Sequence, residues 1–191
     1  MSVTAKKVEV LRFEYHQEKE DPDYGSCVWA NFDFDTENYH LSISSDCGEY
    51  GHGWYVTRTE SFMELMARIY KEYLLNKLCR VSLVDWKRTK EDILKALDEA
   101  DIEDDERNDA IRDLEDLEEY NDVETDIGYT TKLIEEWNSE HAGIPDIWEY
   151  VRTDYTGNEK KIVSVFEKHI QPIIRKFLKD EEEAMTRGGE A

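Results

Sequence analysis

SCVWANFDFDTENYHLSIS, residues 26–44, carries apolar side chains at alternate positions on both sides of a polar turn. The alternating residues are Val28, Ala30, Phe32 and Phe34 before the turn, and Tyr39, Leu41 and Ile43 after it. A period of two is typical of a strand with one buried and one solvated face. The polar residues at 35–38, Asp-Thr-Glu-Asn, suit the turn itself. This stretch therefore predicts an antiparallel hairpin.

Further strands are expected on either side of this hairpin. Residues 7–16 form one candidate, in which the apolar parity changes between Val10 and Leu11. That change predicts a bulge or a strand with two covered faces. On the other side, the glycine-rich segment 46–53 predicts a turn with left-handed backbone at its glycines, followed by a strand at 54–58. The result is an antiparallel meander of three or four strands.

Helical periodicity begins after the meander. Ser61 and Glu64 match a capping box, and the apolar residues of 61–79 then recur at helical spacing. A second strong apolar stripe covers 162–178, where Pro172 predicts a kink or a break. The shorter helical patterns lie at 89–100, 101–126, 130–138 and 145–151.

These patterns predict an α+β fold. An N-terminal antiparallel β-meander packs on a helix, and a mostly helical C-terminal half follows, with an acidic helical insertion. The expected segments are 1–88 for the meander and its packing helix, 89–142 for the acidic helices, and 143–191 for C-terminal helices that pack back on the core. With 191 residues, 39% of them hydrophobic and 12% aromatic, the chain has enough packing material for one compact domain with an acidic lobe.

The net charge of −22 is unevenly distributed along the chain. Residues 91–126 hold 18 acidic and 3 basic residues, so this segment alone carries −15. Direct binding to nucleic acid or to an anionic membrane is disfavoured, because both require a basic surface. A basic protein surface is the natural partner. The absence of an apolar leader and the three cysteines without a framework spacing favour the cytoplasm as the location.

The run DIEDDERNDAIRDLEDLEEYNDVETD, residues 101–126, contains fourteen carboxylates and two arginines. On a helical wheel, four apolar residues share one inward face, namely Ala110, Ile111, Leu114 and Leu117. A helix of this length spans roughly 39 Å and carries one net charge per roughly 3.3 Å, close to the ~3.4 Å of a single DNA strand. The run therefore predicts either an electrostatic interaction surface or a plain solvated helix face. The candidate partner-binding residues are Asp101, Asp104, Asp105, Asp109, Asp113, Asp116, Glu119 and Asp122.

Metal sites and catalytic motifs find less support in the sequence. A calcium loop needs a central glycine and alternating acids, which residues 98–109 lack. Cys47 and His52, with Cys27 and Cys79 as further ligands, form a conceivable metal site, but the paired short spacings of structural zinc are missing. No motif of a nucleophilic, metal-dependent or phosphate-loop enzyme is present. We therefore expect a binding protein that is not an enzyme and uses no cofactor.

Residues 39–79 join a strand that ends in Ser45-Asp46, a glycine-containing turn, the aromatic pair Trp54-Tyr55, and a helix that closes in Tyr-Leu-Leu-Asn-Lys-Leu at 73–78. This pattern resembles a family of phage and prophage accessory proteins, and the likeness extends more loosely to 147–151 and 170–178. The resemblance implies a phage accessory gene and no particular reaction. Cys47 and the strength of the acidic block depart from the general pattern of that group.

Three functions follow as hypotheses. The leading one is an inhibitor of a host defence nuclease, of anti-CRISPR or anti-restriction type, whose acidic surface mimics DNA and occupies a basic nucleic-acid channel. The first alternative is a phage adaptor or assembly protein that binds through an apolar surface or a β-edge, with acids that only keep it in solution. The second alternative is a small enzyme or nucleotide binder that uses the Gly48–Gly53 loop.

Overall fold

The computed structural model describes residues 2–21, 24–56, 60–81, 83–100, 102–120 and 126–188. The chain forms two compact units: unit 1 consists of Met1–Arg80 and Gly157–Ala191, and unit 2 of Val81–Thr156. Unit 2 is therefore an insertion within the sequence of unit 1. The expected segments ended at 88 and 142, whereas the units divide after residues 80 and 156. The α+β prediction is confirmed, because an antiparallel sheet precedes a mostly helical remainder.

Unit 1 is built on a four-stranded antiparallel sheet in the order β1-β2-β3-β4. Its strands are β1 (Leu11–His16), β2 (Trp29–Asp35), β3 (His40–Ser45) and β4 (Gly48–Gly53). The predicted hairpin is confirmed: β2 pairs with β3, and Phe32 lies opposite Ile43. Phe32 and Ile43 are both buried, so the alternating apolar side chains form the covered face of the sheet.

The glycine-rich segment differs from its prediction. Residues 48–53 form strand β4 rather than a turn, and residues 54–56, which were expected to begin the next strand, are irregular. The turn from β3 to β4 is short because Gly48, with φ of 123°, reverses the chain and the Ser45 hydroxyl donates a hydrogen bond to the Gly48 carbonyl at 2.7 Å. Gly51 does not adopt left-handed backbone; it lies in the strand, where a Cβ would come 3.3 Å from Cε1 of His40.

The helix predicted over 61–79 is divided into α1 (Phe62–Arg68) and α2 (Lys71–Leu78). The capping box of Ser61 and Glu64 is confirmed at the start of α1. Ile69 and Tyr70 adopt extended backbone with ψ of 133° and 155°, which ends the first helix before the second begins. The apolar periodicity continues across this break, so the sequence pattern does not reveal it.

The C-terminal helical run consists of α6 (Gly157–Val165), the π-helix η2 (Phe166–Ile170) and α7 (Gln171–Gly188). The chain does not break at Pro172, which lies in the first turn of α7, and a π turn directly precedes that helix. Pro172 has no N–H to donate to the carbonyl of Lys168, and a π turn accommodates that missing bond.

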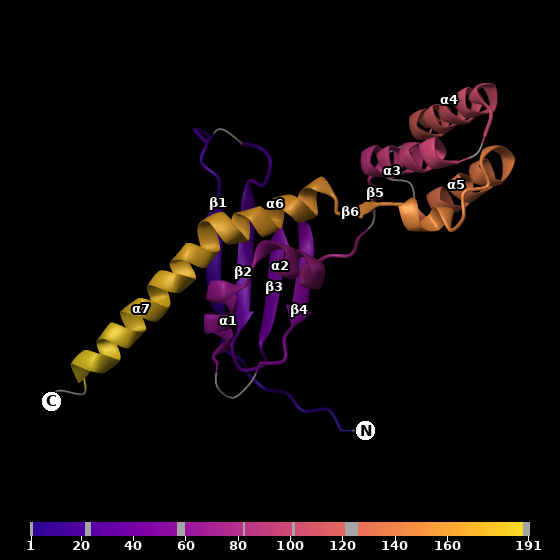
Figure 1. The fold of residues 1–191 in the computed structure, drawn as a ribbon. Coiled ribbons are helices and arrows are strands. Elements are labelled where there is room, and N and C mark those ends of the chain that lie inside the picture. Colours follow the sequence, from indigo (N-terminus) through magenta and orange to yellow (C-terminus); the bar gives the residue numbers. More distant parts are fainter. Residues whose placement is uncertain are drawn as a thin grey trace. The chain divides into compact units, whose positions relative to one another are not determined.

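The core of unit 1 lies between the sheet and its helices. Helices α1, α2, α6 and α7 lie over one face of the sheet (Figure 1). Ring contacts join the two layers, with centroid distances of 6.0 Å for Phe32 and Phe166 and 6.2 Å for Phe34 and Phe62. These contacts bury the alternating face of β2.

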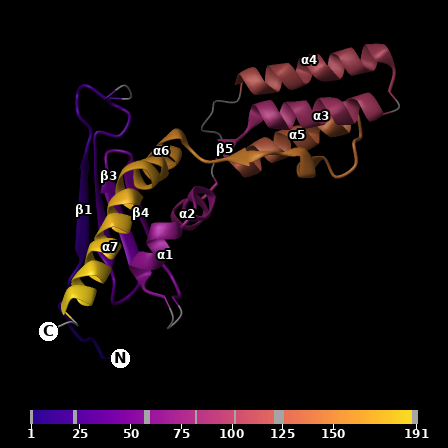
Figure 2. The same ribbon diagram turned by 60° about the vertical axis from the view of Figure 1, so that its left-hand side comes forward.

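Unit 2 contains three main helices, α3 (Trp86–Glu99), α4 (Asp104–Tyr120) and α5 (Ile127–His141), which run beside one another (Figure 2). The expected helix at 145–151 is the shorter 3-10 helix η1 (Ile147–Tyr150). Strands β5 (Leu83–Val84) and β6 (Thr153–Asp154) pair where the chain enters and leaves the unit. No helix among the described residues is long and apolar enough to cross a membrane.

Candidate functional site

The exposed side of α4 carries a regular row of charged side chains. We define the outer stripe as Asp105, Asp109, Arg112, Asp116 and Glu119. These residues follow one another at spacings of four and three, which places them along one side of the helix. All five side chains are exposed, and the row spans about 21 Å of the helix axis.

The opposite side of α4 holds the helix in place. Ala110 and Leu114 are fully buried in the core of unit 2, and Ile111 and Leu117 pack against that core. The predicted inward face is thereby confirmed. Trp137 of α5 donates a hydrogen bond from Nε1 to the Ala110 carbonyl at 3.0 Å, so α4 is fixed both by apolar packing and by a directed bond.

Ion pairs join the flanks of α4 to the neighbouring helix α3. Lys90 of α3 contacts Glu115 at 3.1 Å and Glu118 at 3.2 Å. Burial lowers the pKa of the Lys90 ammonium group, but the hydrogen bonds to both carboxylates outweigh this effect and raise the pKa above its ordinary value of 10.5. In the opposite sense, Arg107 of α4 pairs with Asp98 of α3. These ion pairs hold α3 against α4. None of them involves a residue of the outer stripe.

The structure separates the predicted site residues into paired and unpaired groups. Arg112 contacts Asp109 at 3.1 Å and Asp113 at 3.4 Å, and Asp113 also lies 3.1 Å from Nε2 of His141. Within the described part of the chain, four exposed members of the set make no ion pair: Asp104, Asp105, Asp116 and Glu119. Asp101 and Asp122 lie outside the described residues.

Unit 2 concentrates the negative charge of the molecule. It holds 25 acidic and 8 basic residues, a net charge of −17, whereas unit 1 holds 21 and 16, a net charge of −5. The inserted unit is therefore a strongly acidic three-helix body, and an excess of this size attracts basic surfaces over about a Debye length, ~8–10 Å at moderate salt.

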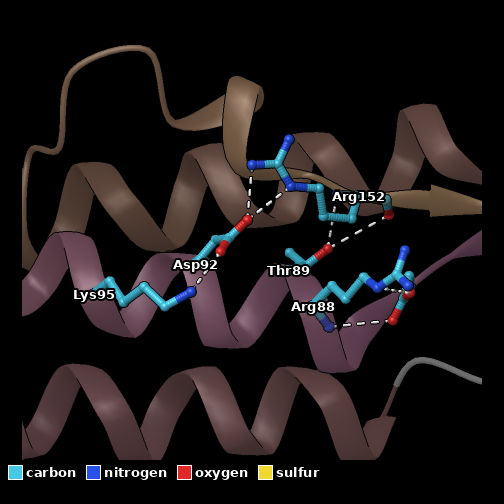
Figure 3. Close-up of polar contacts among 6 residues, drawn as sticks. Arg88, Thr89, Asp92, Lys95 and Arg152 are labelled. Atoms are coloured by element: carbon cyan, nitrogen blue, oxygen red, sulfur yellow. Dashed lines mark hydrogen bonds and ion pairs between the residues drawn. The ribbon is translucent and has the colours of Figure 1, made fainter.

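A polar clasp closes unit 2 at its two ends (Figure 3). Both Nε and Nη2 of Arg152 lie 2.7 Å from Oδ2 of Asp92, and the Lys95 ammonium donates to the other oxygen of Asp92 at 3.0 Å. Thr89, fully buried, accepts a hydrogen bond from the Arg152 backbone N–H at 2.9 Å. Asp85 accepts from the Arg88 backbone N–H at 3.1 Å and caps α3. The clasp ties the start of α3 to the chain that returns from η1.

Comparison with known protein families identifies the family of the chain. The model of a phage protein family, Phage_phiTE_072, matches residues 1–176. The chain belongs to this phage family. No curated protein and no solved structure matches it. The matched range spans all of unit 2 and most of unit 1, so the expectation of a phage protein is confirmed, and its activity against a host defence stays a prediction.

Two cysteines of the phage protein come together where β2 begins and β3 ends. Ligand atoms of Cys27, Asp46 and Cys47 all lie within 4.8 Å of one another, and both cysteines are buried. The Cys47 thiol lies 3.2 Å from the Ser26 carbonyl and donates to it, while the Asp46 carboxylate accepts from the Val28 N–H at 2.8 Å. Burial raises the pKa of the Cys27 thiol well above its usual range. These hydrogen bonds are those of a packed structural turn.

The metal set considered from sequence does not assemble in the phage protein. His52 is not a member of the cysteine group; its ring lies 4.6 Å from the Trp54 ring in an edge contact, and burial lowers its pKa. Asp46 is the member that sequence reasoning missed, although it precedes Cys47 directly. The Gly48–Gly53 segment is a paired strand, which removes the loop that the nucleotide-binding alternative required.

Proposed function

We propose that this phage protein inhibits a host defence nuclease, of the anti-CRISPR or anti-restriction type, by presenting the outer stripe of α4 to a basic nucleic-acid channel. The observation that carries the proposal is the row of exposed carboxylates at positions 105, 109, 116 and 119 on a helix whose other side is anchored in a core. The function is binding rather than catalysis, and the partner is a basic protein of the host cytoplasm.

Charge repulsion supports a role beyond solubility. Asp105 and Asp109 are four residues apart, and Asp116 and Glu119 three, so each pair costs a few tenths of a kcal/mol of helix stability. Asp116 and Glu119 also lie toward the C-terminal end of α4, where the helix dipole disfavours negative charge. Acidic residues at these positions lower the stability of the helix. A function in binding a basic partner accounts for their presence.

The ion pairs of α4 indicate which carboxylates are available to bind the partner. Asp113 is engaged by Arg112 and His141, so it contributes less free charge than its neighbours. Asp105, Asp116 and Glu119 are exposed and make no ion pair among the described residues, so their full charge is available to lysine and arginine side chains of a partner. Asp104 at the start of α4 extends this surface.

The test measures whether the protein blocks DNA cleavage by purified host restriction endonucleases and CRISPR effector complexes. We expect wild-type protein to inhibit one class of these nucleases, with inhibition that weakens steeply as salt rises from about 50 to 200 mM. A variant with Asp105→Lys, Asp109→Lys, Asp116→Lys and Glu119→Lys is expected to lose inhibition. The matched control reverses four exposed acids of unit 1, Glu14→Lys, Glu18→Lys, Glu20→Lys and Glu49→Lys, and is expected to inhibit normally.

Two results decide against the proposal. Inhibition that survives the four reversals shows that the outer stripe is not the binding surface. Inhibition that is lost equally in the control shows that overall charge, rather than the geometry of α4, is what matters.

A further inference from the structure

A cavity of about 550 Å³ in unit 1 is lined by two lysines and a histidine together with a single carboxylate. We call it the basic pocket and define it by Lys161, Lys168, His169, Tyr15, Tyr24 and Asp21, which line it. Three other cavities of the described residues are each lined by at least one carboxylate and by no lysine, arginine or histidine. In a chain of net charge −22, basic residues gathered around one cavity point to an anionic ligand.

The two lysines are available for such a ligand. Lys161 comes from α6 and Lys168 from η2, and both line the same cavity. Neither forms an ion pair within the described residues. Asp21, the acid that lines the pocket, accepts a hydrogen bond from the Glu18 N–H at 3.0 Å and is thus partly engaged by the backbone.

The π turn contributes to this arrangement. Lys168 and His169 both lie in η2, the wider turn that precedes Pro172. The His169 ring lies 5.0 Å from the ring of Tyr15 on β1, so the turn is held against the edge strand by a ring contact. π turns of this kind recur at functional sites because they change the side to which helical side chains point.

Aromatic and hydroxyl-bearing residues complete the lining of the basic pocket. Tyr24 lines the cavity and is 46% exposed, so part of its side chain is accessible to a ligand. The hydroxyls of Ser26 and Ser164 also line the cavity and can hydrogen-bond a sugar or a base edge. The cavity volume lies within the range of small-molecule sites, and stacking on an aromatic ring stabilises bases of any sequence.

We propose that the basic pocket binds a nucleotide, with its phosphate held by Lys161 and Lys168 and its base stacked on Tyr24. Phosphate groups are the anions that paired lysine ammonium groups recognise, and an aromatic ring beside them selects a ligand that also carries a base. This site is separate from the outer stripe and does not depend on inhibition of a nuclease. It also differs from the Gly48–Gly53 segment, which forms a strand.

The experiment is isothermal titration of the full chain with each of the four ribonucleoside monophosphates, with adenosine and with inorganic phosphate. We expect at least one nucleotide to bind below about 1 mM, the upper end of ordinary ligand concentrations, and adenosine and phosphate alone to bind about tenfold or more weakly. The variant Lys161→Gln with Lys168→Gln, which changes two exposed side chains, is expected to lose about tenfold or more in affinity. Tyr24→Leu is expected to reduce nucleotide affinity without changing the affinity for phosphate.

Two control variants test whether the effect is specific to the basic pocket. Lys176→Gln changes an exposed lysine of α7 outside the pocket and is expected to bind as the wild type does. The fourfold reversal of the outer stripe is also expected to leave nucleotide affinity unchanged, which keeps this proposal distinguishable from the proposed function. The proposal is overturned if no nucleotide binds at about 1 mM, if phosphate binds as tightly as the nucleotides, or if the double lysine variant binds normally.

Discussion

Gln171 and Ile69, 102 residues apart in sequence, are joined by a hydrogen bond of 2.7 Å from the Gln171 side-chain Nε2 to the Ile69 carbonyl. The same Nε2 donates to the Met66 carbonyl at 3.1 Å, and Arg175 donates to the Ala67 carbonyl at 2.8 Å. The carbonyls at the end of α1 are thus satisfied by α7 rather than by a further helical turn. This long-range cap explains why α1 ends although the apolar periodicity continues.

We predict that Gln171→Leu destabilises the protein by about 2–4 kcal/mol, because two buried carbonyls lose their donor and the side chain is itself buried. Urea unfolding followed by circular dichroism measures this change. Lys176→Ala, an exposed substitution on the same helix, is expected to change stability by less than about 0.5 kcal/mol. Equal stability of the two variants would show that the cap does not hold α1.

We predict that Asp116→Asn with Glu119→Gln raises stability by a few tenths of a kcal/mol at low ionic strength, because the two like charges near the C-terminal end of α4 are removed. Thermal unfolding at low and high salt measures the effect, which is expected to shrink as salt screens the repulsion. Lys90→Met provides the contrast, since it leaves Glu115 and Glu118 without their partner and is expected to destabilise unit 2. Loss of stability on neutralising the stripe would indicate a structural role for these acids.

We predict that the three thiols react slowly with a disulfide reagent at pH 8 in the native protein. Cys27, Cys47 and Cys79 are buried. Burial raises the pKa of the Cys79 thiol to about 12 and that of Cys27 further, so little thiolate is present at this pH. Absorbance after mixing measures the number of reactive thiols, and the same reaction in guanidinium chloride should report all three at once. A native thiol that reacts rapidly would contradict this account of the cysteine cluster.

We predict a pH-dependent contribution from the clasp of unit 2. Hydrogen bonds from Arg152 and then Lys95 hold the pKa of Asp92 below its ordinary value of 3.8. Because the folded-state pKa is depressed, this stabilisation is present above pH 3.8 and is lost as the pH falls through the folded-state pKa. Asp92→Asn should therefore be less stable than wild type at pH 7 and equally stable near the acid limit.

The measurement compares urea unfolding of wild type and Asp92→Asn between pH 7 and pH 3, so that other acids cancel in the difference. Asp35→Asn provides a comparison in unit 1. The pKa of Asp35 is lowered mainly by a hydrogen bond from Asn38, so the stability difference between this variant and wild type is also expected to shrink as the pH falls. A stability difference that does not change with pH would show that Asp92 acts through packing rather than through its charge.

Local chemistry was sufficient for much of this fold. The alternation at 28–34 and 39–43 predicted the central hairpin, because a period of two requires only neighbouring residues and one buried face. The capping box at Ser61 is likewise a property of a few adjacent residues. The inward face of α4 followed from helical spacing alone.

The sequence by itself determined the strand alternation, the helix starts, the inward and outward sides of α4 and the concentration of negative charge in the middle of the chain. Only the tertiary structure decided which carboxylates are paired, because Lys90 of α3 and His141 of α5 reach carboxylates of α4, and Arg107 of α4 reaches Asp98 of α3. It also divided the helix at Ile69 through Gln171 and brought Tyr24 to the same cavity as Lys168. Such features depend on contacts between distant residues, which local periodicity does not encode.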